Sequence, residues 1–234
     1  MWDIVASFRL AFGLITGADP ELWRIVSLSL EVSVASALIA CAIGLPLGAL
    51  VAVKPFPGRR ALVVAMNALF GLPSVVVGLV VYLLLSRAGP LGSLGILFTP
   101  PAIVIAQTLL VLPIVAALAR QFVEDAWQEY REQLTSLGVS AVRAVPTLLW
   151  DLRYSLLTVV LAGLGRSASE VGAVMIVGGN IDGVTRVMTT AIALKTAEGD
   201  LPLALALGIV LLAMVLLLNA AAYGVREWSV KHHG

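Results

Sequence analysis

The amino-acid sequence contains four long stretches without a single Asp, Glu, Lys or Arg: 32–53, 61–86, 88–119 and 201–225. About 20 apolar residues in a helix cross the ~30 Å hydrocarbon core of a bilayer, and every one of these stretches is long enough to do so. Charged residues make up 12% of the chain, whereas about 25% is usual in a soluble domain. This composition excludes a freely soluble globular protein and predicts an all-α integral membrane protein.

The apolar stretches predict five membrane spans. The stretch 146–178 contains four charged residues, Asp151, Arg153, Arg166 and Glu170, but is otherwise apolar. The first part of 88–119 is rich in Gly and Pro, so we expect a loop there and a span from about 101 onward. Proline lacks a backbone N–H, so Pro46, Pro73 and Pro113 are expected to kink their helices. The predicted spans are 21–53, 60–86, 101–122, 147–178 and 201–226.

An odd number of spans places the two ends of the chain on opposite sides of the membrane. The loops 54–60 and 120–153, together with the C-terminus, carry nine Lys or Arg residues, against five on the other side. Loops with the excess of Lys and Arg face the cytoplasm. The sequence therefore predicts an N-terminus outside and a C-terminus in the cytoplasm. No linker or convincing repeat divides residues 1–234, which predicts a single transmembrane domain.

The segment 1–20 predicts an amphipathic helix that precedes the first span. Its apolar residues share one helical face, opposite Asp3, Ser7 and Thr16. Asp3 precedes any basic residue, so a signal peptide is not expected. We predict a helix along the outer membrane interface. The alternative is a helix that packs on the protein's own surface.

The sequence shows no arrangement typical of an enzyme. None of its three lysines follows a glycine, so a nucleotide-binding P-loop is absent. His232 and His233 lie at the end of the chain, so no base at membrane depth would activate Ser167 or Ser169. A single cysteine, Cys41, excludes a disulfide framework, and a net charge of +1 provides no field for binding nucleic acid. We expect no catalytic residue, metal or cofactor in this chain.

The loop 120–153 concentrates charge more than any other segment. The pattern predicts a helix over 124–137 that ends at Gly138, and a short second helix capped by Ser140. A short helix between two bends on the cytoplasmic side would suit the docking of a soluble partner. The alternative is an ordinary solvated loop, although ~34 residues would be long for one.

The sequence Glu132-Gln-Leu-Thr-Ser-Leu-Gly138 resembles the E-A-A-x-x-x-G loop of ABC-importer permease subunits. It departs from that pattern at Gln133 and Leu134, which replace two alanines, and at Asp151, where most members have a proline. The resemblance implies that the helix after Gly138 inserts into a groove of an ATPase subunit, which would hold the ATP and Mg. The implied coupling residues are Glu132, Leu137, Gly138, Val139, Ser140 and Arg143.

Arg166 and Glu170 lie within the fourth predicted span. Four residues apart on a helix, they would share a face and could pair. Arg166 would lie about 20 Å into the bilayer, counted from Arg153 at ~1.5 Å per residue. An ionised side chain at the centre of a span costs ~2.5–3.5 kcal/mol. Two interpretations remain open, a gate or pore wall and a salt bridge that locks helices together.

The residues that follow predict a short outer helix within 182–200. Its amino end, with Asn180 and Thr185, could offer backbone amides and hydroxyl groups to a passing anion. The alternative is that this end of the helix forms a mouth where a binding protein docks. The strings Ser169-Glu-Val-Gly-Ala-Val-Met-Ile-Val-Gly-Gly-Asn180 and Thr185-Arg-Val-Met-Thr-Thr-Ala-Ile192 resemble the oxyanion permeases, above all the tungstate permease subunits. The predicted pore or gate residues are Arg166, Ser167, Ser169, Glu170, Asn180, Thr185 and Thr189.

This resemblance implies a type I ABC-importer transmembrane domain in a prokaryotic inner membrane. It would form the path for tungstate as a homodimer, because five spans can hardly enclose a path alone. Its implied partners are a dimer of ATPase subunits and an extracytoplasmic oxyanion-binding protein. Molybdate or sulfate are alternative cargoes. The alternative from another class of transport protein is a secondary transporter that works without ATP. In that case Arg166 and Glu170 would form a proton relay.

Overall fold

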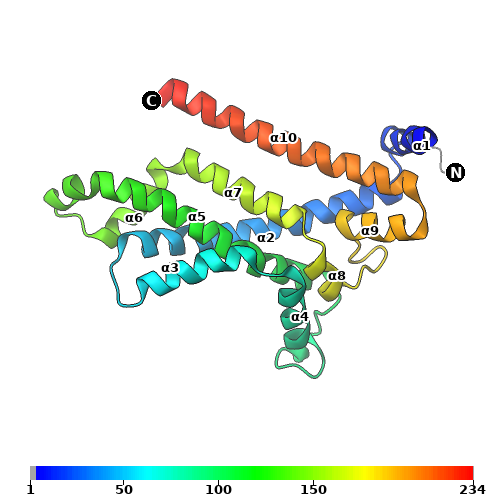
Figure 1. Ribbon diagram of the computed structural model, residues 1–234, viewed down its shortest axis with the longest axis horizontal. Helices are drawn as coiled ribbons and strands as arrows, with labels where there is room; N and C mark the ends of the chain where they lie inside the picture. The colour runs from blue at the N-terminus through cyan, green and yellow to red at the C-terminus, as the bar shows by residue number, and fades with distance from the viewer. Residues whose placement is uncertain (1–3, 234) are drawn as a thin grey trace. The chain divides into compact units, whose positions relative to one another are not determined.

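The computed structural model describes the backbone of residues 4–233 and the side chains of residues 6–221, 223 and 224. Asp3 and the side chains of His232 and His233 lie outside the described residues. Within these residues all regular structure is helical, which confirms the predicted all-α fold (Figure 1). The helices are α1 (Ile4–Thr16), α2 (Pro20–Val53), α3 (Arg59–Ala68), η1 (Leu69–Gly71), α4 (Ser74–Leu85), η2 (Gly92–Leu94), α5 (Pro100–Ser136), α6 (Ala141–Asp151), α7 (Arg153–Ala168), α8 (Gly172–Gly178), α9 (Met188–Glu198) and α10 (Leu201–His233).

Three helices in the described part of the chain are long and apolar enough to cross a membrane alone: α2, α5 and the part Leu201–Ala221 of α10. Two bent pairs of helices bring the number to five if each pair counts as one span. The helix α5 continues well past the predicted end of its span at 122 and includes the cytoplasmic helix expected from 124. Glu, Gln and Arg are good helix formers, so the helix does not stop where the apolar residues do.

The predicted span over 60–86 is bent at its proline: α3 and η1 meet α4 at an angle of 100°, which confirms the kink expected at Pro73. The bend falls at Leu72 and Pro73. Leu72 is extended, with φ −57° and ψ 124°, as expected for a residue before proline, whose ring excludes the helical conformation of its neighbour. By contrast, α2 and α5 remain helical through Pro46 and Pro113.

The predicted span over 147–178 is divided among three helices. The helices α6 and α7 meet at 79°, α7 ends at Ala168, and α8 is separate. Pro146 lies inside α6. Only one face of α6 is buried, through Ala144, Val145 and Leu148, and such a helix is stable along a protein surface rather than across the apolar interior.

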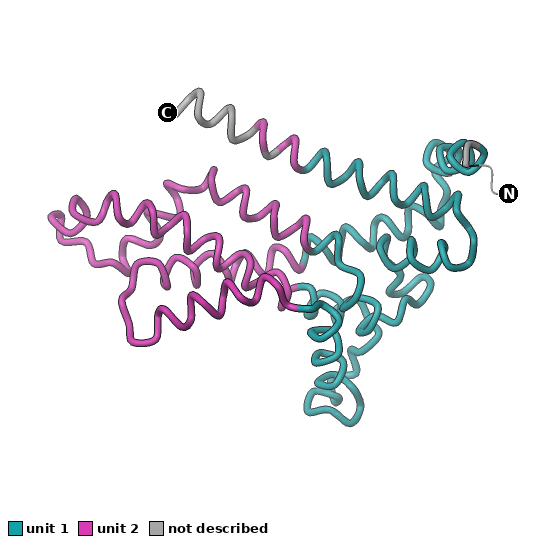
Figure 2. Tube along the Cα trace, in the orientation of Figure 1, with its two compact units in different colours: residues 1–35, 73–107, 167–218 teal, residues 36–72, 108–166, 219–234 magenta. Residues whose placement is uncertain are grey.

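The chain forms two compact units, each assembled from three separate stretches of sequence (Figure 2). Unit 1 contains residues 1–35, 73–107 and 167–218, and unit 2 contains residues 36–72, 108–166 and 219–234. Neither unit is a contiguous part of the sequence.

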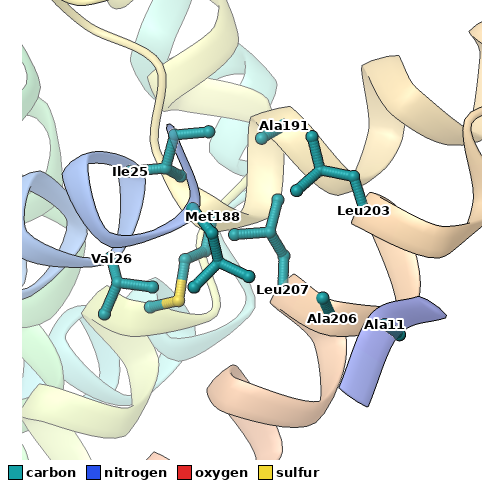
Figure 3. Packing of buried hydrophobic residues seen from close by; sticks show 9 residues of the cluster. Ala11, Ile25, Val26, Met188, Ala191, Leu203, Ala206 and Leu207 are labelled. Carbon is teal, nitrogen blue, oxygen red and sulfur yellow. The ribbon is translucent and has the colours of Figure 1, made fainter. Parts of the chain in front are cut away.

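The core of unit 1 joins α1, α2, α9 and α10, as Figure 3 shows. Ala11 of α1 is fully buried in this cluster, so one face of the amino-terminal helix packs on the protein, as the alternative expected. Phe8, Leu10 and Phe12 of the same helix are exposed. An apolar exposed surface of this kind suits a lipid environment. The residues of the core are Ala11, Leu22, Ile25, Val26, Met188, Ala191, Leu203, Ala206 and Leu207.

Unit 2 is held together by close packing of α2 against α5. A Cβ atom added at Gly48 would lie 2.2 Å from the carbonyl oxygen of Ala116 and 2.9 Å from the backbone nitrogen of Arg120. A Cβ added at Gly44 would lie 2.9 Å from a methyl group of Val115. Glycines of this kind let two membrane helices approach until their backbones touch, which increases dispersion contacts where no hydrophobic effect separates protein from lipid.

Candidate functional site

The turn between α5 and α6 has the geometry that the sequence predicts. Gly138 has φ +74°, a conformation that glycine adopts without strain. The amide of Gly138 donates to the carbonyl of Thr135 at 3.0 Å, and that of Val139 to the carbonyl of Leu134 at 2.9 Å. This pair of bonds is the Schellman arrangement, which satisfies the last carbonyls of a helix. Ser140 then precedes the first residue of α6 in an extended conformation.

The same turn exposes apolar side chains. Leu137 is 78% exposed and Trp150, at the other end of α6, is 72% exposed. On the opposite face, Ala144, Val145 and Leu148 pack into a core shared with the end of α2 and with α5. The helix α6 is therefore fixed on one side and open on the other. Of the predicted coupling residues, Val139 is half-buried, and the exposed ones are Glu132, Leu137, Gly138, Ser140 and Arg143.

A charge cluster lies beside this turn and connects three helices of unit 2. Arg59 Nη2 is 2.7 Å from Glu124 Oε1, and Arg120 pairs with the other oxygen of the same carboxylate. Arg59 Nε also donates to the carbonyl of Val51 at 2.8 Å. A cavity of about 510 Å³ lies next to the cluster, lined by residues of α2, α5 and the start of α6. The spacing of Arg120 and Glu124 was visible in the sequence, but nothing there linked Arg59 to them.

In unit 1, Glu170 lies at the break between α7 and α8. Its side chain is buried, with 3% of the residue exposed. The carboxylate Oε1 accepts a hydrogen bond from the amide of Ala173 at 3.3 Å, while the backbone carbonyl accepts one from Thr189 Oγ1 at 2.7 Å. A carboxylate at the start of α8 satisfies a free amide of the first turn and favours the break over a continuous helix.

The structure removes one argument for an Arg166–Glu170 pair. That argument assumed a single helix through both residues, whereas α7 ends at Ala168. Arg166 is half-buried in the last turn of α7, and Ser169 is exposed. The spacing of four residues therefore does not define a shared helical face.

A buried polar pair beside Glu170 was missed by the sequence analysis. Gln107 Nε2 donates to the carbonyl of Ser167 at 3.1 Å, and Ser167 Oγ donates to Gln107 Oε1 at 3.0 Å. Both residues are nearly inaccessible, at 2% and 1%. The only signal in the sequence was one amide side chain in the middle of an apolar span, and nothing there indicated its partner.

The prediction that Asn180 and Thr185 stand at the amino end of the outer helix is wrong, because α9 begins at Met188. Thr185 is fully buried. Its Oγ1 donates to the carbonyl of Gly178 at 2.5 Å and accepts from the amide of Ile181 at 2.9 Å. These bonds close a compact loop ahead of the helix, so Thr185 supports the loop. Asn180 adopts φ +50° in the same loop.

Ion pairs fasten this loop to the start of α2. Arg24 Nη2 lies 2.8 Å from Asp182 Oδ1, and Arg186 Nη1 lies 3.3 Å from the same oxygen. Arg186 Nη1 is also 3.9 Å from Glu21 Oε1. Each pair is at least partly exposed and contributes little alone. Together they define the surface of unit 1 at the predicted outer side.

Comparison with known proteins identifies the family. Residues 44–232 match the model of the binding-protein-dependent transport system inner membrane component. The chain belongs to this family. It is therefore a multi-pass inner-membrane permease component of an ABC importer, and the all-α fold of the described residues agrees with that membership.

Relatives of this permease component match nearly the whole chain. The tungstate uptake system permease protein TupB of Peptoclostridium acidaminophilum is 40% identical over 96% of this chain and 98% of its own length. The protein of the same name from Campylobacter jejuni is 37% identical over 96% of this chain and 94% of its own length. A probable anion ABC transporter permease protein of Haloferax volcanii is 38% identical over 91% of this chain and 94% of its own length. These relatives are permease subunits.

Proposed function

We propose that the chain is the permease subunit of an ATP-driven tungstate importer. The observation that carries this proposal is the similarity, from end to end, to relatives named as tungstate uptake permeases. The resemblance of the string Ser169–Asn180 to that subfamily supports it. Tungstate is a dianion, and polar side chains gather around the break between α7 and α8, within a predicted span: Ser167 bonds to Gln107, and Thr189 bonds to the carbonyl of Glu170.

In the proposed assembly two copies of the chain form the path, each as one transmembrane domain with its N-terminus outside and its C-terminus in the cytoplasm. Two ATPase subunits bind below and hold the ATP and Mg, and an oxyanion-binding protein docks above. The chain itself needs no cofactor. The exposed apolar face of α1, with Phe8, Leu10 and Phe12, lies in the outer membrane interface.

The proposed coupling starts at the turn around Gly138. Leu137 and the open face of α6 contact the ATPase subunit, and the closure of that subunit moves α6. Because α6 shares a core with α2 and α5, and because Glu124 connects α5 to Arg59 at the start of α3, the displacement reaches three helices of unit 2 together. A packed core transmits such a displacement because it does not compress.

The proposed path uses weak contacts. A conduit works when each site binds the ion strongly enough to admit it and weakly enough to release it. Ser169 is exposed beside the buried Glu170, and hydroxyl groups such as this one bind an anion by single hydrogen bonds. The negative charge of Glu170 opposes tight binding of a dianion, which suits release.

The role of Glu170 is tested by Glu170→Gln. The glutamine Oε1 can still accept the bond from the amide of Ala173, so the start of α8 keeps its cap while the charge is lost. We expect uptake of tungstate to fall by about tenfold or more, which corresponds to a free-energy difference of ~1.4 kcal/mol. Assembly of the complex should be unchanged. Uptake into proteoliposomes and size-exclusion chromatography of the complex measure the two effects. A variant that fails to assemble would show that the charge locks helices together instead.

The cargo is tested by elemental mass spectrometry of cells with and without this gene, grown at trace supply of tungstate, molybdate and sulfate. We expect cellular tungsten to fall while molybdenum and sulfur stay constant. Loss of molybdenum or sulfur instead would assign a different oxyanion to the same permease. Uptake into proteoliposomes that lack ATP would favour a secondary transporter and contradict the proposed mechanism.

A further inference from the structure

A groove in unit 2 is not used by the proposed transport mechanism. It has a volume of about 380 Å³ and is lined almost entirely by apolar side chains of α2, α6 and α7. Ala42 and Pro46 lie one turn apart on α2. Because their side chains are small, an open groove remains beside them. Leu149, Leu156 and Val160 form the facing wall.

One end of this groove carries a positive charge. Arg153, the first residue of α7, is the single charged residue that lines the groove. Its guanidinium carbon lies 5.1 Å from the ring centre of Trp150 and 4.5 Å from that of Tyr154, and Nη1 donates to the carbonyl of Trp150 at 2.8 Å. These contacts fix the guanidinium. Among the described side chains no carboxylate forms an ion pair with Arg153.

The position of these residues along α7 matches the layers of a bilayer. Trp150 and Tyr154 are residue types that gather at the boundary between lipid and water. Val160 follows Arg153 by seven residues, which is about 10 Å deeper along a helix. The groove therefore runs from a cation at the level of lipid headgroups into the apolar interior.

We propose that the groove binds one acyl chain of an anionic membrane phospholipid whose phosphate pairs with Arg153. The charge at the mouth and the apolar wall behind it match the two halves of such a lipid, and basic pockets between membrane helices on the cytoplasmic side bind anionic headgroups. The bound lipid links the bend between α6 and α7 to α2. This inference rests on the cytoplasmic placement proposed for α6, and it does not depend on which oxyanion is carried.

The test uses the complete importer in nanodiscs with equal amounts of phosphatidylglycerol and phosphatidylcholine. After extraction into mild detergent, native mass spectrometry counts the lipids that remain bound. We expect phosphatidylglycerol to exceed phosphatidylcholine by about fivefold, as for one Arg near a lipid phosphate. Arg153→Gln should reduce this ratio to about one. The matched control is Arg60→Gln, which removes the same charge from an exposed residue outside the groove and should leave the ratio unchanged.

A second variant tests the groove itself. Ala42 is exposed and lines the hollow, so Ala42→Phe fills it without displacing buried residues. We expect this variant to lose bound phosphatidylglycerol while the complex stays assembled. Equal retention of both lipids by the unmodified complex, or an unchanged ratio in Arg153→Gln, would overturn the proposal. Loss of the homodimer in Ala42→Phe would show that a second copy of the chain covers the groove, which also overturns it.

Discussion

Replacement of Gly138 by valine is expected to abolish the stimulation of ATP hydrolysis by loaded binding protein in the assembled importer. Gly138 has φ +74° and nothing lies within 4 Å of a Cβ added there, so the variant places its Cβ without a collision. Its only defect is a left-handed backbone conformation that a β-branched residue adopts with strain of about 1–3 kcal/mol. Opening the turn relieves this strain and moves α6 away from its docking position. Because the core beneath α6 stays intact, insertion and stability should change little.

The measurement compares ATP hydrolysis with and without binding protein, beside the melting temperature of the complex. We expect stimulation to fall by about tenfold or more, which corresponds to ~1.4 kcal/mol. Gly95→Val is the matched control, since Gly95 has φ +62° and equally open surroundings in the loop between α4 and α5. If Gly138→Val keeps normal stimulation, the turn does not couple the permease to an ATPase.

The replacement of Gly48 by alanine is expected to prevent stable assembly. The new methyl group would lie 2.2 Å from the Ala116 carbonyl oxygen, so α2 and α5 have to separate. Overpacking of a core by one group usually costs about 1–3 kcal/mol, and here the obstacle is backbone that cannot rotate away. For a chain of this size each 1 kcal/mol lowers the melting temperature by about 2–4 °C. At the upper value of about 3 kcal/mol, we therefore expect a loss of about 6–12 °C or no recoverable protein.

Gly208→Ala is the control for Gly48→Ala. Gly208 lies in α10 and nothing stands within 4 Å of an added Cβ, so the same substitution adds helix propensity without a collision. Its melting temperature should equal or exceed that of the unmodified chain. A Gly48→Ala variant as stable as this control would show that the two helices do not pack as closely as the structure has them.

The cytoplasmic turn could be predicted from sequence because its signals are local. A glycine after a charged helical stretch and a serine before the next helix identify the boundary at Gly138 and Ser140 without any knowledge of the rest of the fold. The bend at Pro73 was expected from the proline, but the bend at Leu152 was missed because it has no such local signal. Apolar composition alone predicts only that a segment enters the membrane, and a bent pair has the same composition as a straight span.

In the candidate gate around Glu170, too, the features with a local signal were predicted and those that depend on distant residues were not. Glu170 was found because a charge in an apolar stretch is conspicuous, but its bond to the start of α8 depends on a break in the helix that no periodicity indicated. Gln107 was missed because its partner, Ser167, lies 60 residues away. Thr185 was predicted to meet an anion, and its hydroxyl forms two hydrogen bonds to backbone groups of the loop that no local pattern indicated.

The Schellman turn at Gly138 has a consequence for how permeases of this family diverge. Its two hydrogen bonds use only backbone atoms of Leu134, Thr135, Gly138 and Val139, so the shape of the turn does not depend on which side chains flank it. Gln133, which stands where the family pattern has alanine, is exposed and takes no part in those bonds. The exposed residues of the turn can therefore change without altering the path of its backbone. Such changes would alter the surface that the turn presents to a partner protein.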